Sequence, residues 1–316
     1  MAQPANTFDS YDMTGILDDL VDQIFNIDPD DTPFLSKSTK TKASNTYHEW
    51  QTDALRASAD NAHIEGGDTT ADALTATTRL GNYTQIFKNA VSISGTDMAL
   101  RKAGRGKEML YQMGKGMKAH KLDIERALFL NNARVAGSSV VARELAGAPA
   151  WLVTNVEFEA GNSGANPTGD GTDARTDDGT PVAFSQTRFD PAMQLIWENG
   201  GKPDTVYLSS FQMNLALGFT GNNAQRNTVK VGQVEKMIDV YRTPWGVVEF
   251  VLSRENRARD VFIFQDDMWK VAIARETKQE DLAKMGDNER KQIVTELTLE
   301  CCNEKAHGAV YDNTTS

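Results

Sequence analysis

The chain has 316 residues, of which 40% are hydrophobic and 24% charged, a composition typical of a globular protein with one or two domains. The formal net charge of −11 opposes attraction to a phosphate backbone, so a dedicated nucleic-acid-binding protein is not expected. The sequence has no run of roughly 18 apolar residues that could span a membrane, and residues 1–11 do not resemble a signal peptide.

The first 45 residues are predicted to form an arm with little hydrophobic core of its own. Apolar residues recur within it at the spacing of an amphipathic helix: Ile16, Leu17, Leu20, Val21, Ile24 and Phe25. Further along, Thr32 suits the N-cap of a helix and Pro33 its first position, where a missing N–H costs nothing. We therefore expect a helix of one or two turns before Ser38.

Residues 45–94 are predicted to form a long β-hairpin. Its arms would be 45–55 and 79–94, and the connecting tip, 56–78, is rich in Ala, Asp, Gly and Thr. A lone two-stranded ribbon is marginal in water, so the hairpin needs a surface to lie on. A neighbouring subunit is a reasonable candidate for that surface.

Residues 97–134 show the clearest helical pattern. Apolar side chains three, four or seven positions apart form one stripe: Met109, Met113, Met117, Ile124 and Leu128. Such a stripe can line a binding groove, but packing against the core is the favoured interpretation. Gly114 and Gly116 weaken a helix, and their presence indicates close approach of another backbone.

The next segment, 157–186, is rich in Gly, Asp, Thr and Asn and contains two prolines, so an exposed loop or flexible insertion is expected. Residues 187–275 alternate helix and strand signals, which predicts a compact α+β domain. Its first helix would be capped by Asp190, opened by Pro191 and closed at Gly200. The further expected elements are a strand at 205–208, a helix at 211–217, and two hairpins that pair 237–241 with 247–252 and 261–264 with 269–274.

The last segment, 276–316, begins with a polar stretch, 276–290, and continues as a long strand that is expected to pack beside the long helix. Alternation assigns two faces to this strand: Ile293, Thr295, Leu297, Leu299 and Cys301 on one, and Glu296, Thr298 and Glu300 on the other. The adjacent Cys301 and Cys302 would point to opposite faces, so both are predicted to be free thiols of a reducing compartment.

No pattern predicts a catalytic residue, a cofactor-binding residue or a metal ligand. Gly114-Lys115-Gly116 matches a relaxed dinucleotide fingerprint, but it lies in a helical pattern where the N–H groups are already bonded. No Gly-x-Ser-x-Gly nucleophile elbow occurs. His120 is expected at the surface or the core edge. None of the four histidines is paired with another at metal-ligand spacing: His48, His63, His120 and His307.

Two charged segments leave alternatives open. The acidic segment 170–179 could offer oxygen ligands to calcium, but it lacks the order of an EF-hand, so a solvated loop is favoured. The basic cluster at 254–259 could contact an acidic neighbour or a phosphate, and a solvated turn between strands is the simpler interpretation.

The order of arm, long hairpin, long helix, α+β domain and returning strand resembles the Hong Kong 97-like fold of tailed-bacteriophage major capsid proteins. The resemblance is most specific to the SU-ten-type subfamily in four stretches, 28–35, 46–53, 61–66 and 83–95. The resemblance extends over nearly the whole chain and is weakest in the segment 157–186.

The resemblance implies a division of the chain into five parts. Residues 1–45 would be the N-terminal arm, and 46–94 the extended loop, a β-hairpin. Residues 95–186 would form the peripheral domain with its long spine helix. Residues 187–275 would form the axial domain around five-fold and six-fold centres, and 276–316 would complete the peripheral domain.

The resemblance also implies a structural subunit that is not an enzyme and has no cofactor. It would self-assemble into the pentamers and hexamers of an icosahedral or prolate head shell that encloses double-stranded DNA without sequence-specific binding. The shell would be the virion capsid, assembled in the host cytoplasm. The arm begins almost at once, so a separate scaffolding protein is expected, and a portal and a decoration protein are further expected partners.

The contacts within that shell are expected to be non-covalent, because some relatives weld subunits through a lysine of the extended loop and this chain has none between Lys42 and Lys88. Several aromatic residues of the arm and hairpin are expected to be covered only by neighbours: Phe25, Phe34, Tyr47, Trp50 and Phe87. Two alternatives stay open, namely a cellular nanocompartment shell protein of the same fold and a monomeric hydrolase or transferase.

Overall fold

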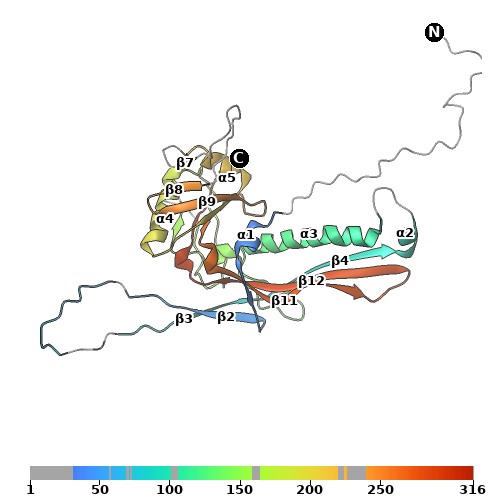
Figure 1. Ribbon diagram of the computed structural model, residues 1–316, viewed down its shortest axis with the longest axis horizontal. Coiled ribbons are helices and arrows are strands. Elements are labelled where there is room, and N and C mark those ends of the chain that lie inside the picture. The colour runs from blue at the N-terminus through green and yellow to red at the C-terminus, as the bar shows by residue number, and fades with distance from the viewer. Residues whose placement is uncertain are drawn as a thin grey trace, which may run out of the picture.

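The computed structural model describes residues 31–56, 58–68, 71, 73–100, 106–158, 164–219, 224–225 and 240–315. Two sheets and a long helix organise this part of the chain, and a two-stranded ribbon projects from it (Figure 1). The predicted α+β class is therefore confirmed. None of the described helices is long and apolar enough to cross a membrane.

A four-stranded sheet carries the long helix α3 (Glu108–Phe129), which lies against β4 and β12 (Figure 1). The apolar stripe of α3 faces the sheet, where Met109 and Met113 pack in one cluster with Ile293. The prediction of a long strand beside the helix is thus confirmed. The strands stand in the order β1 (Thr39–Lys42), β11 (Trp269–Leu282), β12 (Asn288–Cys301) and β4 (Gln85–Ser94); only the β1–β11 pair is parallel.

A seven-stranded sheet forms the other half of the described chain. The helices α4 (Gln186–Glu198) and α5 (Ser210–Ala216) pack against its strands. Ser209 caps α5 by accepting a hydrogen bond from the Gln212 N–H. The strands stand in the order β5 (Val156–Glu157), β13 (Gly308–Val310), β10 (Val261–Phe264), β6 (Thr205–Leu208), β9 (Gly246–Leu252), β8 (Val240–Thr243) and β7 (Ala224–Gln225).

The first predicted hairpin of this region is confirmed for β8 and β9, whereas residues 237–239 lie outside the described part. The second is wrong, because β10 and β11 do not pair with each other. β10 lies between β13 and β6, whereas β11 lies between β1 and β12 in the other sheet. The short 3-10 helix η2 (Asp266–Met268) carries the chain across, so the turn signal marks a change of sheet.

The two sheets share one hydrophobic core. Phe34 of the short helix α1 (Pro33–Lys37) lies at its centre, with its ring centroid 4.9 Å from that of Phe129 and 5.2 Å from that of Phe264. Pro33 occupies the start of α1 as predicted, but the Thr32 side chain makes no cap hydrogen bond. Further members come from both halves of the molecule: Leu128, Trp151, Tyr207, Phe262, Trp269 and Leu299.

The predicted long hairpin is only partly correct. β2 (Tyr47–Thr52) pairs with β3 (Thr78–Tyr83) over six positions, from Tyr47 opposite Tyr83 to Thr52 opposite Thr78. The second predicted arm, 79–94, is divided at Thr84, after which β4 pairs with β12. The alternation of Val91 and Ile93 therefore reports a strand of the main sheet, and periodicity alone could not show which partner the strand would take.

Two predicted helices have different bounds in the structure. The predicted helix 97–134 is too long: α2 (Gly95–Ala99) is a separate short helix, residues 101–105 lie outside the described part, and α3 ends at Phe129. α4 begins at Gln186, so Asp190 is not its cap and Pro191 lies inside the helix. The fully buried face of α4 overrides the proline signal: Phe189, Ala192, Met193 and Ile196.

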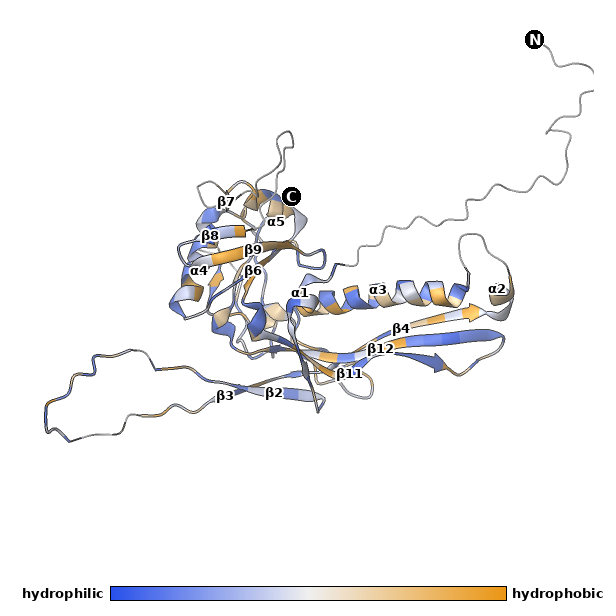
Figure 2. Cartoon of the chain, in the orientation of Figure 1, coloured by the Kyte–Doolittle hydropathy of each residue, from blue (hydrophilic) through white to orange (hydrophobic). Residues whose placement is uncertain are grey.

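The expectation of an exposed loop at 157–186 is wrong for much of that segment. Arg175 and Asp178 are buried, as is Phe184. Gly, Asp and Thr occur here because tight turns pack the segment against the C-terminal residues, not because it is solvated throughout. Residues 159–163 lie outside the described part. The polar stretch 276–290 supplies the distal ends of β11 and β12, which are hydrophilic in Figure 2.

Candidate functional site

The most exposed described feature is the segment that joins β2 to β3, residues 53–77. Its described residues, 53–56, 58–68, 71 and 73–77, project beneath the seven-stranded sheet (Figure 1). Three large apolar side chains on it are almost fully exposed: Leu55 at 99%, Ile64 at 87% and Leu74 at 96%. Apolar side chains in such a position favour an interaction surface.

The base of the ribbon is anchored firmly to the protein. His48 Nε2 lies 3.0 Å from Glu300 Oε2, and Lys270 Nζ lies 3.2 Å from Glu300 Oε1. Burial alone would raise the pKa of Glu300, but the hydrogen bonds and charges of these two partners outweigh burial and lower the pKa. On the same strand, the Trp50 ring packs against Trp151, with centroids 5.2 Å apart.

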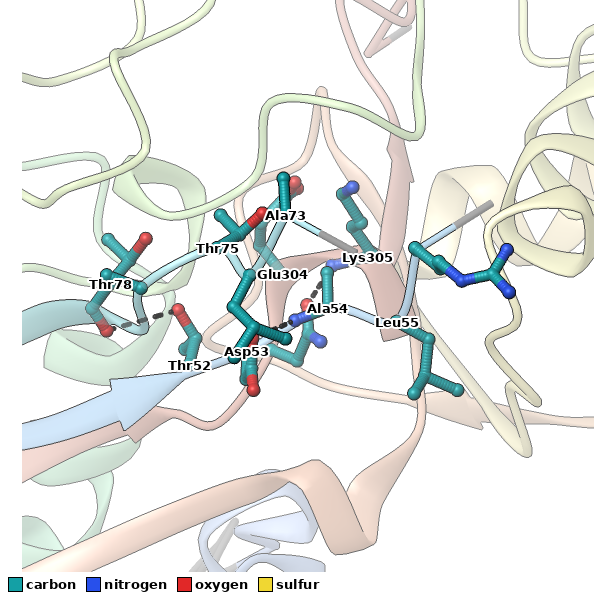
Figure 3. Close-up of a pocket in the computed structure, with 13 residues that line it drawn as sticks. Thr52, Asp53, Ala54, Leu55, Ala73, Thr75, Thr78, Glu304 and Lys305 are labelled. Carbon is teal, nitrogen blue, oxygen red and sulfur yellow. Dashed lines mark hydrogen bonds between the residues drawn. The ribbon is translucent and has the colours of Figure 1, made fainter. Parts of the chain in front are cut away.

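A hollow lies where the loop leaves the ribbon (Figure 3). The Thr52 hydroxyl donates to the Thr78 carbonyl across the two strands at 3.4 Å. Glu304 and Lys305, from the 3-10 helix η3 (Glu304–Ala306), line the other side. Apolar side chains, Leu55 and Leu74 among them, line this hollow together with polar ones, and it lies at the junction between the loop and the body of the protein.

The base of the N-terminal arm is held by a buried carboxylate. Glu125 of α3 accepts hydrogen bonds from the backbone N–H groups of Phe34 at 2.9 Å and Leu35 at 2.7 Å. Burial raises the pKa of Glu125 to about 7, although these two hydrogen bonds and the nearby Lys40 oppose the shift. Sequence inspection missed this residue, and its signal is an acidic side chain beside the apolar stripe of the helix.

The aromatic residues predicted to need neighbours are mostly covered by their own chain. Phe34, Trp50 and Phe87 are buried within the protomer, so the prediction is wrong for them. Tyr47 is half-buried and packs on Tyr83, with ring centroids 4.7 Å apart. Phe25 lies outside the described residues. Among the described residues of the ribbon and its loop, the exposed large apolar side chains are therefore aliphatic: Leu55, Ile64 and Leu74.

The four histidines are not brought together. His48 joins Glu300 at the ribbon base, whereas His63 is exposed on the loop 2.8 Å from Asn61. His120 is buried and bonds Thr295 at 2.8 Å, so its predicted place at the surface or core edge is wrong. Burial lowers the pKa of His307 to about 3. Among the described residues, no group of three His, Cys, Asp or Glu side chains is placed to hold a metal ion.

The basic cluster at 254–259 turns inward onto acids of the same chain. Arg259 contacts Asp312 at 2.7 Å, and Arg257 pairs with Asp177 and, at 2.8 Å, with Asp260. Arg175 also binds Asp312 in this buried network. The interpretation of a solvated turn is therefore wrong for these arginines, which join the 165–182 segment to the C-terminal residues. In the acidic segment, Asp170 and Asp173 accept hydrogen bonds from Thr168 and Thr172.

The glycines of α3 and Cys301, which the sequence also singled out, occupy positions inside secondary structure or the core. Gly114 and Gly116 lie inside α3, away from a helix N-terminus, as the sequence predicts. Cys301 is buried and Cys302 half-buried, and both are unbridged. The described part of the chain therefore offers a projecting ribbon and an anchored arm as its functional features.

Comparisons with known proteins agree on one family. The family model for the SU10 major capsid protein matches residues 3–314. The major capsid protein of Escherichia phage Phieco32 is 28% identical over 351 residues, which cover 98% of each chain.

Solved structures show the same fold at low sequence identity. The capsid asymmetric unit of cyanophage A-1(L) aligns with a TM-score of 0.62 at 12% identity and covers 98% of this chain and 99% of its own. The capsid of a native GTA particle aligns with a TM-score of 0.60 at 8% identity, and the alignment covers 96% of this chain and 97% of the GTA chain. The capsid structure of cyanophage P-SCSP1u aligns with a TM-score of 0.59 at 11% identity, and the alignment covers 98% of this chain and 100% of the cyanophage chain.

Proposed function

This chain belongs to the SU10 major capsid protein family, and from that premise we propose how its protomer builds a shell. It is a bacteriophage major capsid protein with a Hong Kong 97-like fold, a structural component of the virion capsid that assembles in many copies. Its role as a shell subunit supports the proposal that it has no catalytic activity.

The proposed division of the protomer corresponds to the two sheets only in part. Residues 1–45 would be the arm and 46–94 the extended loop. The peripheral domain would contain α3 with 95–186 and 276–316, and the axial domain would contain 187–275. The strands β5 and β13 come from the peripheral ranges but pair in the seven-stranded sheet, so the two proposed domains would be interlocked through these strands.

The loop at 53–77 is proposed to lie on a neighbouring protomer in pentamers and hexamers. The observation that carries this proposal is the exposure of Leu55, Ile64 and Leu74 on a segment whose base is firmly anchored. Burying these side chains in a neighbour removes apolar surface from water at roughly 25 cal/mol per Å². Repetition of the same contact around a symmetry axis closes a ring.

Three further partners are proposed for the shell. A separate scaffolding protein, a portal and a decoration protein would cooperate with the shell in the host cytoplasm. The support for a decoration protein is indirect: a solved structure from phage G, with a TM-score of 0.54, contains major capsid proteins together with decoration proteins.

Deletion of residues 61–75 tests the loop proposal. The truncated protein should stay soluble and folded, because the ribbon base at His48 and Trp50 is retained, but it should fail to form normal shells. Negative-stain imaging and sedimentation of the expressed protein would measure this, with thermal unfolding as the check of folding.

A full-length triple variant separates the effect of losing the apolar side chains from the effect of shortening the loop. Replacing Leu55, Ile64 and Leu74 with serine should also impair assembly, whereas the matched exchange of Ala62 and Ala73 for serine in the same loop should not. Normal shells from either the deletion or the triple variant would refute the assignment of the loop.

A further inference from the structure

One face of α3 is turned away from the sheet and carries positive charge in an acidic protein. Lys115 and Lys121 are exposed on it, and Lys107 is exposed just before the helix. Of the three acidic residues of α3, two are buried and the third lies on the side of β4. Glu108 and Glu125 are buried, and Asp123 is contacted by the Asn89 side chain of β4 at 3.4 Å.

The same face has a place for close approach of another backbone. Leu110 is 70% exposed, and Gly114 follows it one turn later. A methyl group added to Gly114 would meet no atom within 4 Å. Glycine inside a helix costs about 1 kcal/mol relative to alanine, and nothing in the described protomer requires it at this position. A helix packed against this face would use both the space and Leu110.

The sequence of the chain outside the described part complements this face. Residues 1–30 contain seven aspartates and no lysine, arginine, glutamate or histidine, so they carry −7 of the net charge of −11. Within them, the segment 14–26 has apolar residues at helical spacing and three aspartates: Asp18, Asp19 and Asp22.

The arm begins on the same side of α3. Residues 107, 114, 118 and 125 follow one another at spacings of seven, four and seven, which places them on one side of the helix. Glu125 binds the N–H groups of α1 there, and Figure 1 shows α1 at the C-terminal end of α3. The chain that precedes α1 therefore starts at one end of the lysine face.

The lengths also agree. The stretch from Lys107 to Lys121 rises about 21 Å along the helix, and residues 14–26 would rise about 20 Å as a helix. The intervening residues 27–31 can span roughly 17 Å when extended, which is sufficient to bring the segment alongside α3.

We propose that, in the unassembled protomer, the acidic leader at residues 9–26 docks in cis on the lysine face of α3. Its apolar residues would cover Leu110 and the surface beside Gly114, while its aspartates lie within a Debye length of Lys115 and Lys121. Docking would keep the leader away from other copies until neighbours compete for it. The proposal concerns the dilute protomer, so its test does not depend on shell formation.

Zero-length carbodiimide coupling of full-length protein at low concentration tests the contact. Equal amounts of ¹⁵N-labelled and unlabelled chains are mixed, coupled, digested and analysed by mass spectrometry. Cross-links between Asp12, Asp18, Asp19 or Asp22 and Lys115 or Lys121 should join peptides of the same isotope. Mixed-isotope links alone would show exchange between copies and overturn docking in cis, as would the absence of leader-to-α3 links.

Charge reversal provides an independent readout. The double variant Lys115→Glu with Lys121→Glu should let chymotrypsin cleave within residues 8–25 about tenfold faster, because the docked population falls. Adding Asp18→Lys, Asp19→Lys and Asp22→Lys should restore protection. The matched control, Lys278→Glu with Lys284→Glu, reverses two exposed lysines near the β11–β12 turn and should leave cleavage unchanged.

A nucleic-acid role of the same face is the competing outcome. If the α3 double variant lost affinity for DNA fragments while cleavage of the leader stayed at the wild-type rate, the lysine face would bind phosphate and the proposal would be wrong. Unchanged thermal unfolding of the variants confirms that they fold.

Discussion

At the residue scale, the arm depends on one carboxylate. Glu125 is fully buried and binds two backbone N–H groups of α1, which position Phe34 in the shared core. Replacement by alanine would leave both N–H groups without this acceptor. A buried unsatisfied group costs about 1–3 kcal/mol, so the residue is central to holding the arm base.

The pH dependence of Glu125 gives a testable prediction. Its pKa of about 7 in the folded protein exceeds the unfolded value of 4.5, so the folded state binds the proton more tightly. The contribution of this group to the free energy of unfolding is therefore fully present below pH 4.5 and is lost as pH rises from 4.5 through 7, a fall of about 3 kcal/mol. Glu125→Gln cannot titrate and should lack this fall.

Denaturant unfolding of wild type and Glu125→Gln between pH 5 and pH 8 measures this contribution of Glu125 to the free energy of unfolding. Stability of the variant relative to wild type should rise with pH across this window. The comparison also removes the contribution of Asp260, another buried acid whose pKa is raised to about 7 by burial. A difference that is constant with pH would show that Glu125 does not titrate in this range.

At the scale of elements, the ribbon is stabilised by its contact with the body and not by its own two strands. Trp50 packs on Trp151 and His48 reaches Glu300, so β2 is attached to both the core and β12. Beyond Thr52, where β2 ends, the large apolar side chains of the loop are exposed: Leu55, Ile64 and Leu74.

Trp50→Ala should detach the ribbon base. The loss of a buried aromatic side chain is expected to lower the free energy of unfolding by about 3–5 kcal/mol. Protease cleavage within residues 47–52 should become measurable under native conditions. Trp50→Phe retains a ring in the same place and should cost considerably less; equal losses in both variants would show that packing on Trp151 is not the source of stability.

The elements also show what the sequence could predict. Short-range signals placed β6, α5, the β8–β9 turn and β12 correctly, because periodicity and capping act locally. The predicted strand pairing was wrong where the chain passes from one sheet to another, as it does at Thr84 and at η2. Proline at 191 misled because the core-facing side of α4 outweighs its local preference.

The candidate site was predicted as a region and not as residues. Composition identified the loop, since polar and small residues without periodicity predict exposure. Its aliphatic contacts and the anchoring acids were missed, because a glutamate such as Glu300 reads as solvent-facing until its partner, here His48 from 252 positions away, is known.

At the scale of the whole molecule, subunits are expected to be joined without covalent bonds. The segment between Lys42 and Lys88 contains no lysine, so the loop lacks the amine that such a bond would need. Particles boiled in detergent should therefore migrate in denaturing gels as a single band of the monomer mass. A ladder of multimers that resists boiling would contradict this prediction.

The shared core limits how the protomer can change shape. Phe34, Phe129 and Phe264 interlock α1, α3 and the seven-stranded sheet, and β5 and β13 return to that sheet from distant parts of the chain. Close-packed aromatic rings resist sliding, because separating them opens voids. If an assembled shell of these protomers expands or contracts, each protomer must therefore rotate as a rigid body. The change in shape would then be taken up at the interfaces between protomers.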